Sequence, residues 1–155
     1  MLTALVAVLG TLLGSFVTGA LQVRQTRVAQ DGTRAEQVRR DRLQAVTDLA
    51  AVVSDHRRAM WTRESARLGA APAERVQQLR DASHDTRAAI TRPYVTLQVL
   101  IPHPDVVAAA HEAVSRAYAL REAADPATLD AAREAAKEAH DAFVTASADF
   151  LAVAA

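Results

Sequence analysis

Cysteine is absent from this chain, and aromatic residues (4%) and glycine (5 residues) are scarce. The lack of cysteine removes any disulfide framework and is compatible with a reducing compartment. Aromatic residues are scarce, and no run alternates apolar and polar residues. Both features argue against β-strands. The composition that remains is 50% hydrophobic and rich in alanine, which predicts an all-α protein.

Charged side chains are also absent from residues 1–23, although 23% of the chain is charged and Arg24 opens an arginine-rich segment. About 20 consecutive apolar residues cross the roughly 30 Å hydrocarbon layer of a bilayer, so we expect a single transmembrane helix at residues 1–23. A cleavable signal peptide is the alternative. Signal peptides carry basic residues ahead of an apolar core of about 7 to 15 residues, whereas this segment lacks such residues and its apolar run is longer.

Arginines follow the predicted span. They are Arg24, Arg27, Arg34, Arg39, Arg40 and Arg42. Basic residues within about 20 residues of a membrane helix are retained on the cytoplasmic side, so we expect the N-terminus outside the cytoplasmic membrane and the rest of the chain in the cytoplasm. Anionic lipid attracts each nearby arginine by about 1 kcal/mol, which makes membrane lipid an expected partner. The alternative is that these arginines only determine the orientation.

Small residues recur every four positions inside the predicted span, at Gly10, Gly14 and Thr18. Residues four apart share one face of a helix, and small side chains there allow two helix backbones to approach closely in lipid. This face predicts a homo-oligomer associated through its membrane helices. The alternative is that the glycines only adjust packing against lipid or against the helix of a partner.

The residues after the span favour a helical bundle. Apolar residues recur at three- and four-residue spacing along successive stretches, as in packed helices. Two of these apolar stripes consist of Leu43, Val46, Ala50, Val53, Met60 and Leu68, and of Val106, Ala110, Val114, Ala117 and Leu120. We expect helices over residues 33–68, 72–101, 105–125 and 129–153. Short connections between them predict an up-and-down antiparallel bundle of about four helices at residues 43–155.

Two local signals refine these helices. Thr33 and Glu36 have the spacing of a capping box, which favours a helix start just after Gly32. The alternative is a helix that continues out of the membrane through Gly32. Pro93 lies inside the second predicted helix. Because proline removes one helical hydrogen bond and crowds the preceding turn, we expect it to kink or divide that helix.

Residues 24–42 are expected to form a basic juxtamembrane stalk. At 1.5 Å per residue, the first predicted cytoplasmic helix is about 50 Å long and the third only about 30 Å. The first helix should therefore extend beyond the bundle, and its membrane-proximal part should have no intramolecular partner. Such a stalk can stay solvated, lie on anionic lipid or pair with another subunit.

No motif predicts catalysis, a metal site or a cofactor. The five histidines have no metal-ligand spacing, and there is no glycine-rich phosphate loop. No polar cluster indicates a small-molecule substrate. Direct binding of nucleic acid is disfavoured, because Asp31, Glu36 and Asp41 interrupt the basic segment and no aromatic residue is interleaved with it.

Several strings in the sequence resemble a known family. They are Ala-Leu-Val-Ala-Val-Leu-Gly-Thr-Leu-Leu-Gly-Ser at residues 4–15, Leu21-Gln22, Arg39-Arg40-Asp41-Arg42-Leu43 and the alanine-rich acidic end. Together they are similar to the KilB family of actinomycete conjugative plasmids and chromosomes. The resemblance implies a small membrane-associated protein of plasmid transfer or spread within the mycelium, harmful when uncontrolled, and it carries over no catalytic residue. The ratio of 17 arginines to 1 lysine agrees with a high-GC genome.

Two functions remain open from the sequence. The first is a non-enzymatic, membrane-anchored interaction protein, whose bundle docks or self-associates at the cytoplasmic face beside a membrane protein of a DNA-transfer apparatus. The second is a membrane-perturbing effector, whose apolar segment disrupts the bilayer while the bundle controls assembly. A third idea is a helical sensor with a small ligand between its helices, for which the sequence offers no polar cluster.

Overall fold

The computed structural model describes the backbone of residues 2–153 and the side chains of residues 33–153. Over this part of the chain it contains four α-helices, one short 3₁₀ helix and no strand. The elements are α1 (Leu2–Leu68), α2 (Ala73–Leu100), α3 (Pro104–Ala119), η1 (Leu120–Glu122) and α4 (Pro126–Val153). The predicted all-α fold is confirmed.

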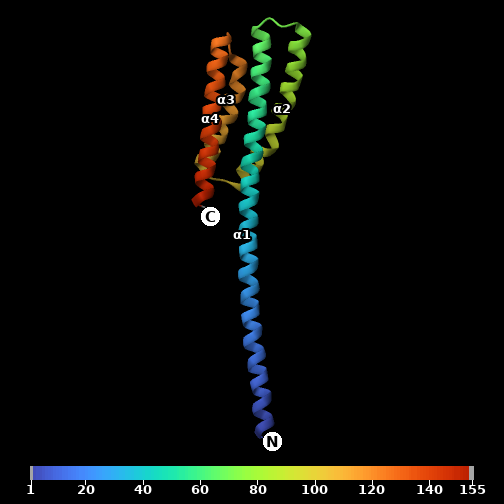
Figure 1. Ribbon diagram of the computed structural model, residues 1–155, viewed down its shortest axis with the longest axis vertical. Helices are drawn as coiled ribbons and strands as arrows, with labels where there is room; N and C mark the ends of the chain where they lie inside the picture. Colours follow the sequence, from blue (N-terminus) through green and yellow to red (C-terminus); the bar gives the residue numbers. More distant parts are fainter. Residues whose placement is uncertain (1, 154–155) are drawn as a thin grey trace. The chain divides into compact units, whose positions relative to one another are not determined.

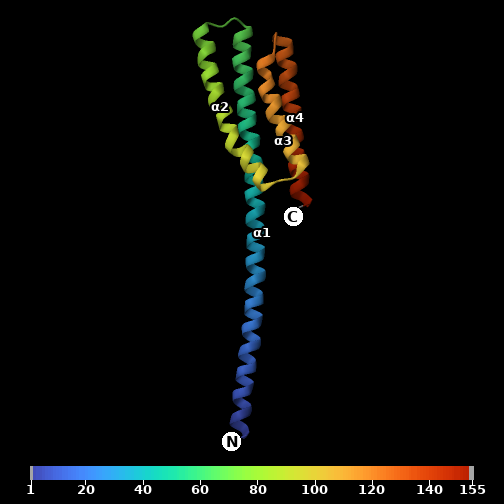
Figure 2. The same cartoon turned by 180° about the vertical axis from the view of Figure 1, so that it is seen from behind.

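The chain divides into two units, Met1–Arg39 and Arg40–Ala155. The first unit contains the N-terminal part of α1. In the second unit the rest of α1 is followed by α2, α3 and α4, which run alternately up and down (Figure 1). Seen from behind, α3 and α4 form a pair, and α2 lies beside α1 (Figure 2). The second unit is thus the antiparallel four-helix bundle that the spacing predicted.

The bundle core contains residues from all four helices. The predicted apolar stripe of α3 is buried throughout. The alanines of this stripe are small, so α4 can approach α3 closely. Phe143 of α4 is fully buried in the same cluster. The cluster consists of Ala45, Val46, Leu49, Val53, Ile90, Leu97, Ile101, Val106, Ala110, Ala113, Val114, Ala117 and Phe143. A smaller cluster near the α1–α2 end is formed by Met60, Leu120, Ala123, Leu129 and Ala136.

The start of α1 differs from the prediction. The helix does not begin at Thr33 but continues through Gly32 from Leu2. A glycine in a helix interior costs only about 1 kcal/mol relative to alanine, and the 67-residue helix tolerates it. The interpretation of Thr33 as an N-terminal cap is therefore wrong, whereas the predicted end at Leu68 is confirmed.

Pro93 does not divide the second helix. The helix α2 runs without a break from Ala73 to Leu100, and Pro93 lies inside it. Ile90 and Leu97 flank this proline and are 2% and 0% exposed in the same core cluster. Burial of each such side chain contributes about 1.5 to 3 kcal/mol. Together these contributions offset the roughly 3 kcal/mol cost of a proline in a helix interior, so α2 stays continuous.

The predicted transmembrane segment, residues 1–23, lies outside the residues whose side chains the structure describes. Within residues 33–153, no helical stretch has both the length and the apolar character needed to cross a bilayer.

Candidate functional site

The sequence predicted functional residues at the N-terminal end of α1. The small residues Gly10, Gly14 and Thr18, and the first two arginines, Arg24 and Arg27, lie outside the described side chains. The next three arginines are exposed on α1. They are Arg34, Arg39 and Arg40.

The last predicted stalk arginine, Arg42, belongs to the bundle. Its Nε donates a hydrogen bond to the backbone oxygen of Leu100 at 3.2 Å, and its guanidinium carbon lies 5.5 Å from the ring centroid of Phe150. These contacts join α1 to the ends of α2 and α4. The expectation that the stalk has no intramolecular partner is therefore wrong for Arg42, because its long side chain reaches back to the bundle.

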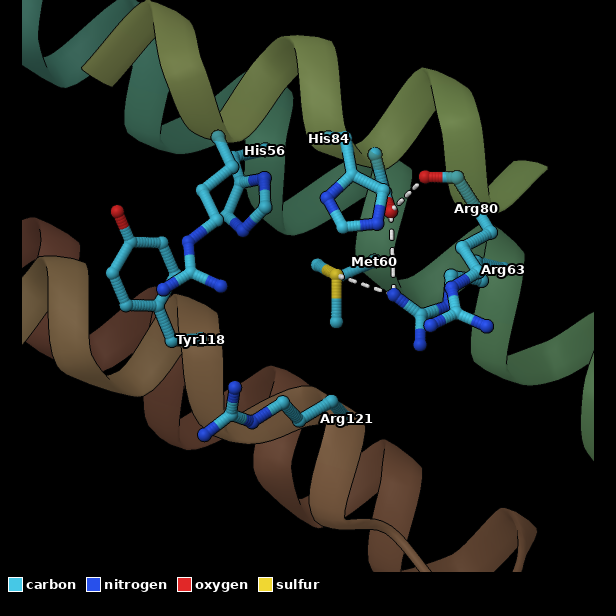
Figure 3. A pocket seen from close by; sticks show the side chains of 9 residues that line it. His56, Met60, Arg63, Arg80, His84, Tyr118 and Arg121 are labelled. Atoms are coloured by element: carbon cyan, nitrogen blue, oxygen red, sulfur yellow. Dashed lines mark hydrogen bonds between the residues drawn. The ribbon is translucent and has the colours of Figure 1, made fainter. Parts of the chain in front are cut away.

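A polar cavity of about 160 Å³ lies between α1, α2 and the segment formed by α3 and η1. Four of its lining residues are arginines, and none is an aspartate or glutamate. Figure 3 shows the side chains around a common space, with those of α1 and α2 facing those of α3 and η1. This cavity, termed the arginine pocket, is lined by His56, Met60, Arg63, Arg80, Ser83, His84, Arg87, Tyr118 and Arg121.

His56 lies at the buried floor of the arginine pocket and is only 1% exposed. Its Nδ1 lies 2.9 Å from the Thr86 hydroxyl oxygen, and that hydroxyl donates its proton to the backbone oxygen of Ser83. A hydroxyl has one proton, so with Thr86 donating to Ser83 it accepts from His56, and we assign the imidazole proton to Nδ1 on this basis. Nε2 is consequently an unprotonated acceptor, and it is buried without a hydrogen-bond partner.

Arg63 forms the inner wall of the arginine pocket. Its Nη1 donates to the Ser83 hydroxyl at 3.3 Å, and its Nε lies 3.1 Å from Oε1 of the fully buried Glu64. Arg67 donates its Nε–H to the other oxygen of the same carboxylate. Glu64 therefore forms ion pairs with both Arg63 and Arg67, and its single negative charge only partly balances the charge of Arg63.

Three more arginines form the exposed rim of the arginine pocket. The guanidinium carbon of Arg87 lies 4.7 Å from the ring centroid of Tyr118. Arg121 lies 3.8 Å from the carboxylate of Glu122, which is itself well exposed. Among the described side chains, neither Arg80 nor Arg87 has a carboxylate within ion-pair distance. The pocket thus gathers positive charge that the surrounding carboxylates do not neutralise.

Burial, and after it the positive charges of Arg87 and Arg63, together lower the pKa of His56 from 6.5 to about 4. Both effects disfavour an imidazolium at this position. At neutral pH His56 is therefore uncharged, which agrees with an unprotonated Nε2.

This pKa predicts that the bundle loses stability between pH 6.5 and 4. In this range the unfolded chain binds a proton on His56, whereas the folded chain does not, so the free energy of unfolding falls as the pH falls, by about 3 kcal/mol over the whole window. The groups that face this imidazole are Arg63, Arg87, the Tyr118 ring and the Thr86 hydroxyl.

Denaturant unfolding of the full-length chain at about pH 7.5 and about pH 5 measures this loss. His56→Phe retains the bulk of the ring without its proton, so its free energy of unfolding should change much less between these two pH values. An equal change in both proteins would show that His56 is not the group that titrates.

No polar cluster between the helices was evident from the sequence, whereas the structure assembles one in the arginine pocket. The informative signal is polar residues at core-facing helix positions. His56 continues the α1 stripe of Leu49 and Val53, and Ser83 precedes Ile90 by seven residues on the buried face of α2. Polar residues at such positions require a partner or a function.

The fold and this pocket define an all-helical bundle protein with a basic cavity between its helices. Residues 43–151 match the family described as KilB plasmid transfer protein. The protein named "Protein KilB" from Streptomyces lividans is 45% identical over 148 residues, which cover 96% of this chain and 97% of that relative. The chain therefore belongs to the KilB plasmid transfer protein family, as the resemblance predicted. No solved structure matches it.

Proposed function

We propose that this protein is a non-enzymatic, single-pass membrane protein that acts in plasmid transfer or spread through protein–protein contacts of its bundle. The observation that carries the proposal is family membership over nearly the whole chain, combined with the charge boundary at Arg24. Twenty-three residues without a charged side chain precede this boundary, which is sufficient length for one crossing.

The proposed arrangement has residues 1–23 in the cytoplasmic membrane, the N-terminus outside and the bundle in the cytoplasm. The arginines that follow the span support this orientation, because basic flanks are retained on the cytoplasmic side. Arg34, Arg39 and Arg40 are exposed on α1. In the proposal they attract anionic membrane lipid.

The bundle supplies the interaction surface in this proposal. Its partners are further copies of this chain and a membrane protein of the DNA-transfer apparatus. Direct nucleic-acid binding forms no part of the proposal, because the exposed acidic residues Glu36 and Asp41 lie among the exposed arginines and weaken an electrostatic footprint for DNA.

Deletion of residues 1–23 tests the proposal. In a Streptomyces mating assay the full chain should restore transfer or spread of a plasmid that lacks its own copy, and it should stay in the membrane fraction after an alkaline carbonate wash. The shortened chain should be found in the wash and fail to restore transfer. Full transfer activity of a shortened chain recovered only in the wash would contradict the proposal.

The double substitution Gly10→Leu and Gly14→Leu should weaken self-association of the full-length chain by at least about tenfold, because two bulky side chains separate the backbones at the proposed face. Light scattering after size exclusion in a non-ionic detergent measures the oligomeric state. The matched control, Ser15→Leu with Gly19→Leu, changes two small residues on an adjacent face and should leave the oligomer intact. An unchanged oligomer in the Gly10 and Gly14 variant would show that this face is not the contact.

A membrane-perturbing effector is the competing function. Expression of residues 1–42 alone separates the two, because a bilayer-disrupting segment should stop growth without the bundle. Toxicity of this fragment comparable to that of the full chain would favour the effector. Normal growth would favour the interaction protein.

A further inference from the structure

We propose that the arginine pocket binds the phosphate group of a small ligand, with guanidinium groups holding its charged oxygens and His56 Nε2 accepting the proton of its P–OH group. This inference goes beyond the role in plasmid transfer. It concerns residues 56–121 only, so it does not depend on how the chain is anchored.

The charge of the arginine pocket favours an anion. Arg63, Arg80, Arg87 and Arg121 line one cavity of about 160 Å³, and no carboxylate lines it with them. Like charges around one cavity repel one another. A bound oxyanion removes that repulsion, and the planar guanidinium donates paired hydrogen bonds that match the geometry of phosphate oxygens.

The buried floor distinguishes phosphate from other oxyanions. His56 is 1% exposed, and its Nε2 has no hydrogen-bond partner. With the proton on Nδ1, Nε2 carries a free lone pair and lies buried beneath the pocket that His56 lines. Near neutral pH inorganic phosphate retains a proton that it can donate to this lone pair. Sulfate has no such proton, so its oxygen would face the lone pair and be repelled.

The size of the cavity limits the ligand to a phosphate group. Pockets that enclose drug-sized ligands are about 300 to 1,000 Å³, larger than this cavity of about 160 Å³. A tetrahedral oxyanion with a few waters fits this volume, since one water needs about 10 to 15 Å³ of such accessible space. Arg80, His84 and Arg121 at the rim are exposed, so any larger part of the ligand would extend into solvent.

Two sources share the guanidinium chemistry, namely free inorganic phosphate and a phosphate monoester such as that of a metabolite or a lipid headgroup, but only inorganic phosphate keeps a P–OH proton at neutral pH, because the second pKa of a monoester is about 6. Titration calorimetry of the full-length chain in non-ionic detergent at low salt tests them with inorganic phosphate, glycerol 3-phosphate and sulfate. We expect saturable binding of at least one of the two phosphates, at least about tenfold tighter than sulfate. Whichever of inorganic phosphate and glycerol 3-phosphate binds more tightly identifies the class of ligand.

Matched variants locate the binding. Arg80→Gln with Arg121→Gln removes two rim charges and should weaken phosphate binding at least about tenfold. The control, Arg75→Gln with Arg92→Gln, removes the same charge from exposed arginines of α2 that do not line the pocket, and it should bind as the unmodified chain does. His56→Phe removes the acceptor and should abolish the preference for phosphate over sulfate.

Three results would overturn the proposal. They are no saturable binding of either phosphate at millimolar concentration, equal weakening by the two double variants, and equal affinity for phosphate and sulfate in the unmodified chain. Thermal unfolding followed by circular dichroism confirms that each variant is folded. The exposed arginine pairs keep this test valid even if His56→Phe fails to fold.

Discussion

Replacement of Phe143 by alanine is expected to lower the free energy of unfolding by about 3 to 5 kcal/mol. Phe143 is 0% exposed, and it lies in the core cluster to which all four helices contribute. The substitution removes its ring from the centre of the bundle and leaves a cavity that the rigid helices on either side cannot close completely. This is the largest loss that we expect from a single apolar substitution.

Urea unfolding of the full-length chain in non-ionic detergent measures the loss. The neighbouring Val144 is 41% exposed on the same helix, and Val144→Ala is the matched control, expected to change the stability by no more than about 0.5 kcal/mol. Similar losses for the two variants would contradict the core position of Phe143.

Substitution of both Arg63 and Arg67 by methionine is expected to cost about 3 to 5 kcal/mol, because it leaves the buried Glu64 carboxylate without a cation. Glu64 is 0% exposed, and the two arginines are the ion-pair partners of its carboxylate. Arg67 also donates from Nη2 to the backbone oxygen of Ala123 at 2.6 Å, so the same substitution releases the link between α1 and the segment after η1.

A third substitution tests the cause of this loss. If the unpaired charge dominates, addition of Glu64→Met to the double variant should restore part of the stability. The control pair consists of Arg58→Met and Arg116→Met. These arginines belong to exposed ion pairs, which are worth about 0 to 1 kcal/mol each. A triple variant that is less stable than the double variant would contradict the explanation.

The bundle could be predicted from sequence because its apolar spacing is regular where a helix has one buried face. On α3 every predicted stripe position from Val106 to Ala117 is buried. The prediction was less accurate on α1, where Leu43 was assigned to the stripe but is 52% exposed. There the buried face is set by Ala45, Val46 and Leu49, and spacing alone does not indicate which of several adjacent apolar rows meets the other helices.

The arginine pocket could not be predicted because its residues are distant in sequence. Arg63, Arg87 and Arg121 come from α1, α2 and η1, and only the packing of these elements brings them together. A charged residue next to an apolar stripe is indistinguishable, in sequence, from one on a solvated face. For a related reason the sequence left open whether the first helix continues through Gly32 and whether Pro93 kinks or divides the second. The local cost of Gly32 or Pro93 is visible in sequence, whereas the tertiary packing that offsets the cost of Pro93 is not.

The central claim is that this member of the KilB plasmid transfer protein family crosses the membrane once and holds its bundle in the cytoplasm. Because the chain has no cysteine, a single introduced cysteine can show on which side of the membrane its residue lies. One variant has a cysteine inserted after Met1, and the other carries Val99→Cys at a residue that is 73% exposed. Intact and lysed cells are treated with a membrane-impermeant maleimide. The account predicts labelling of the N-terminal cysteine in intact cells and of Val99→Cys only after lysis; labelling of Val99→Cys in intact cells would contradict it.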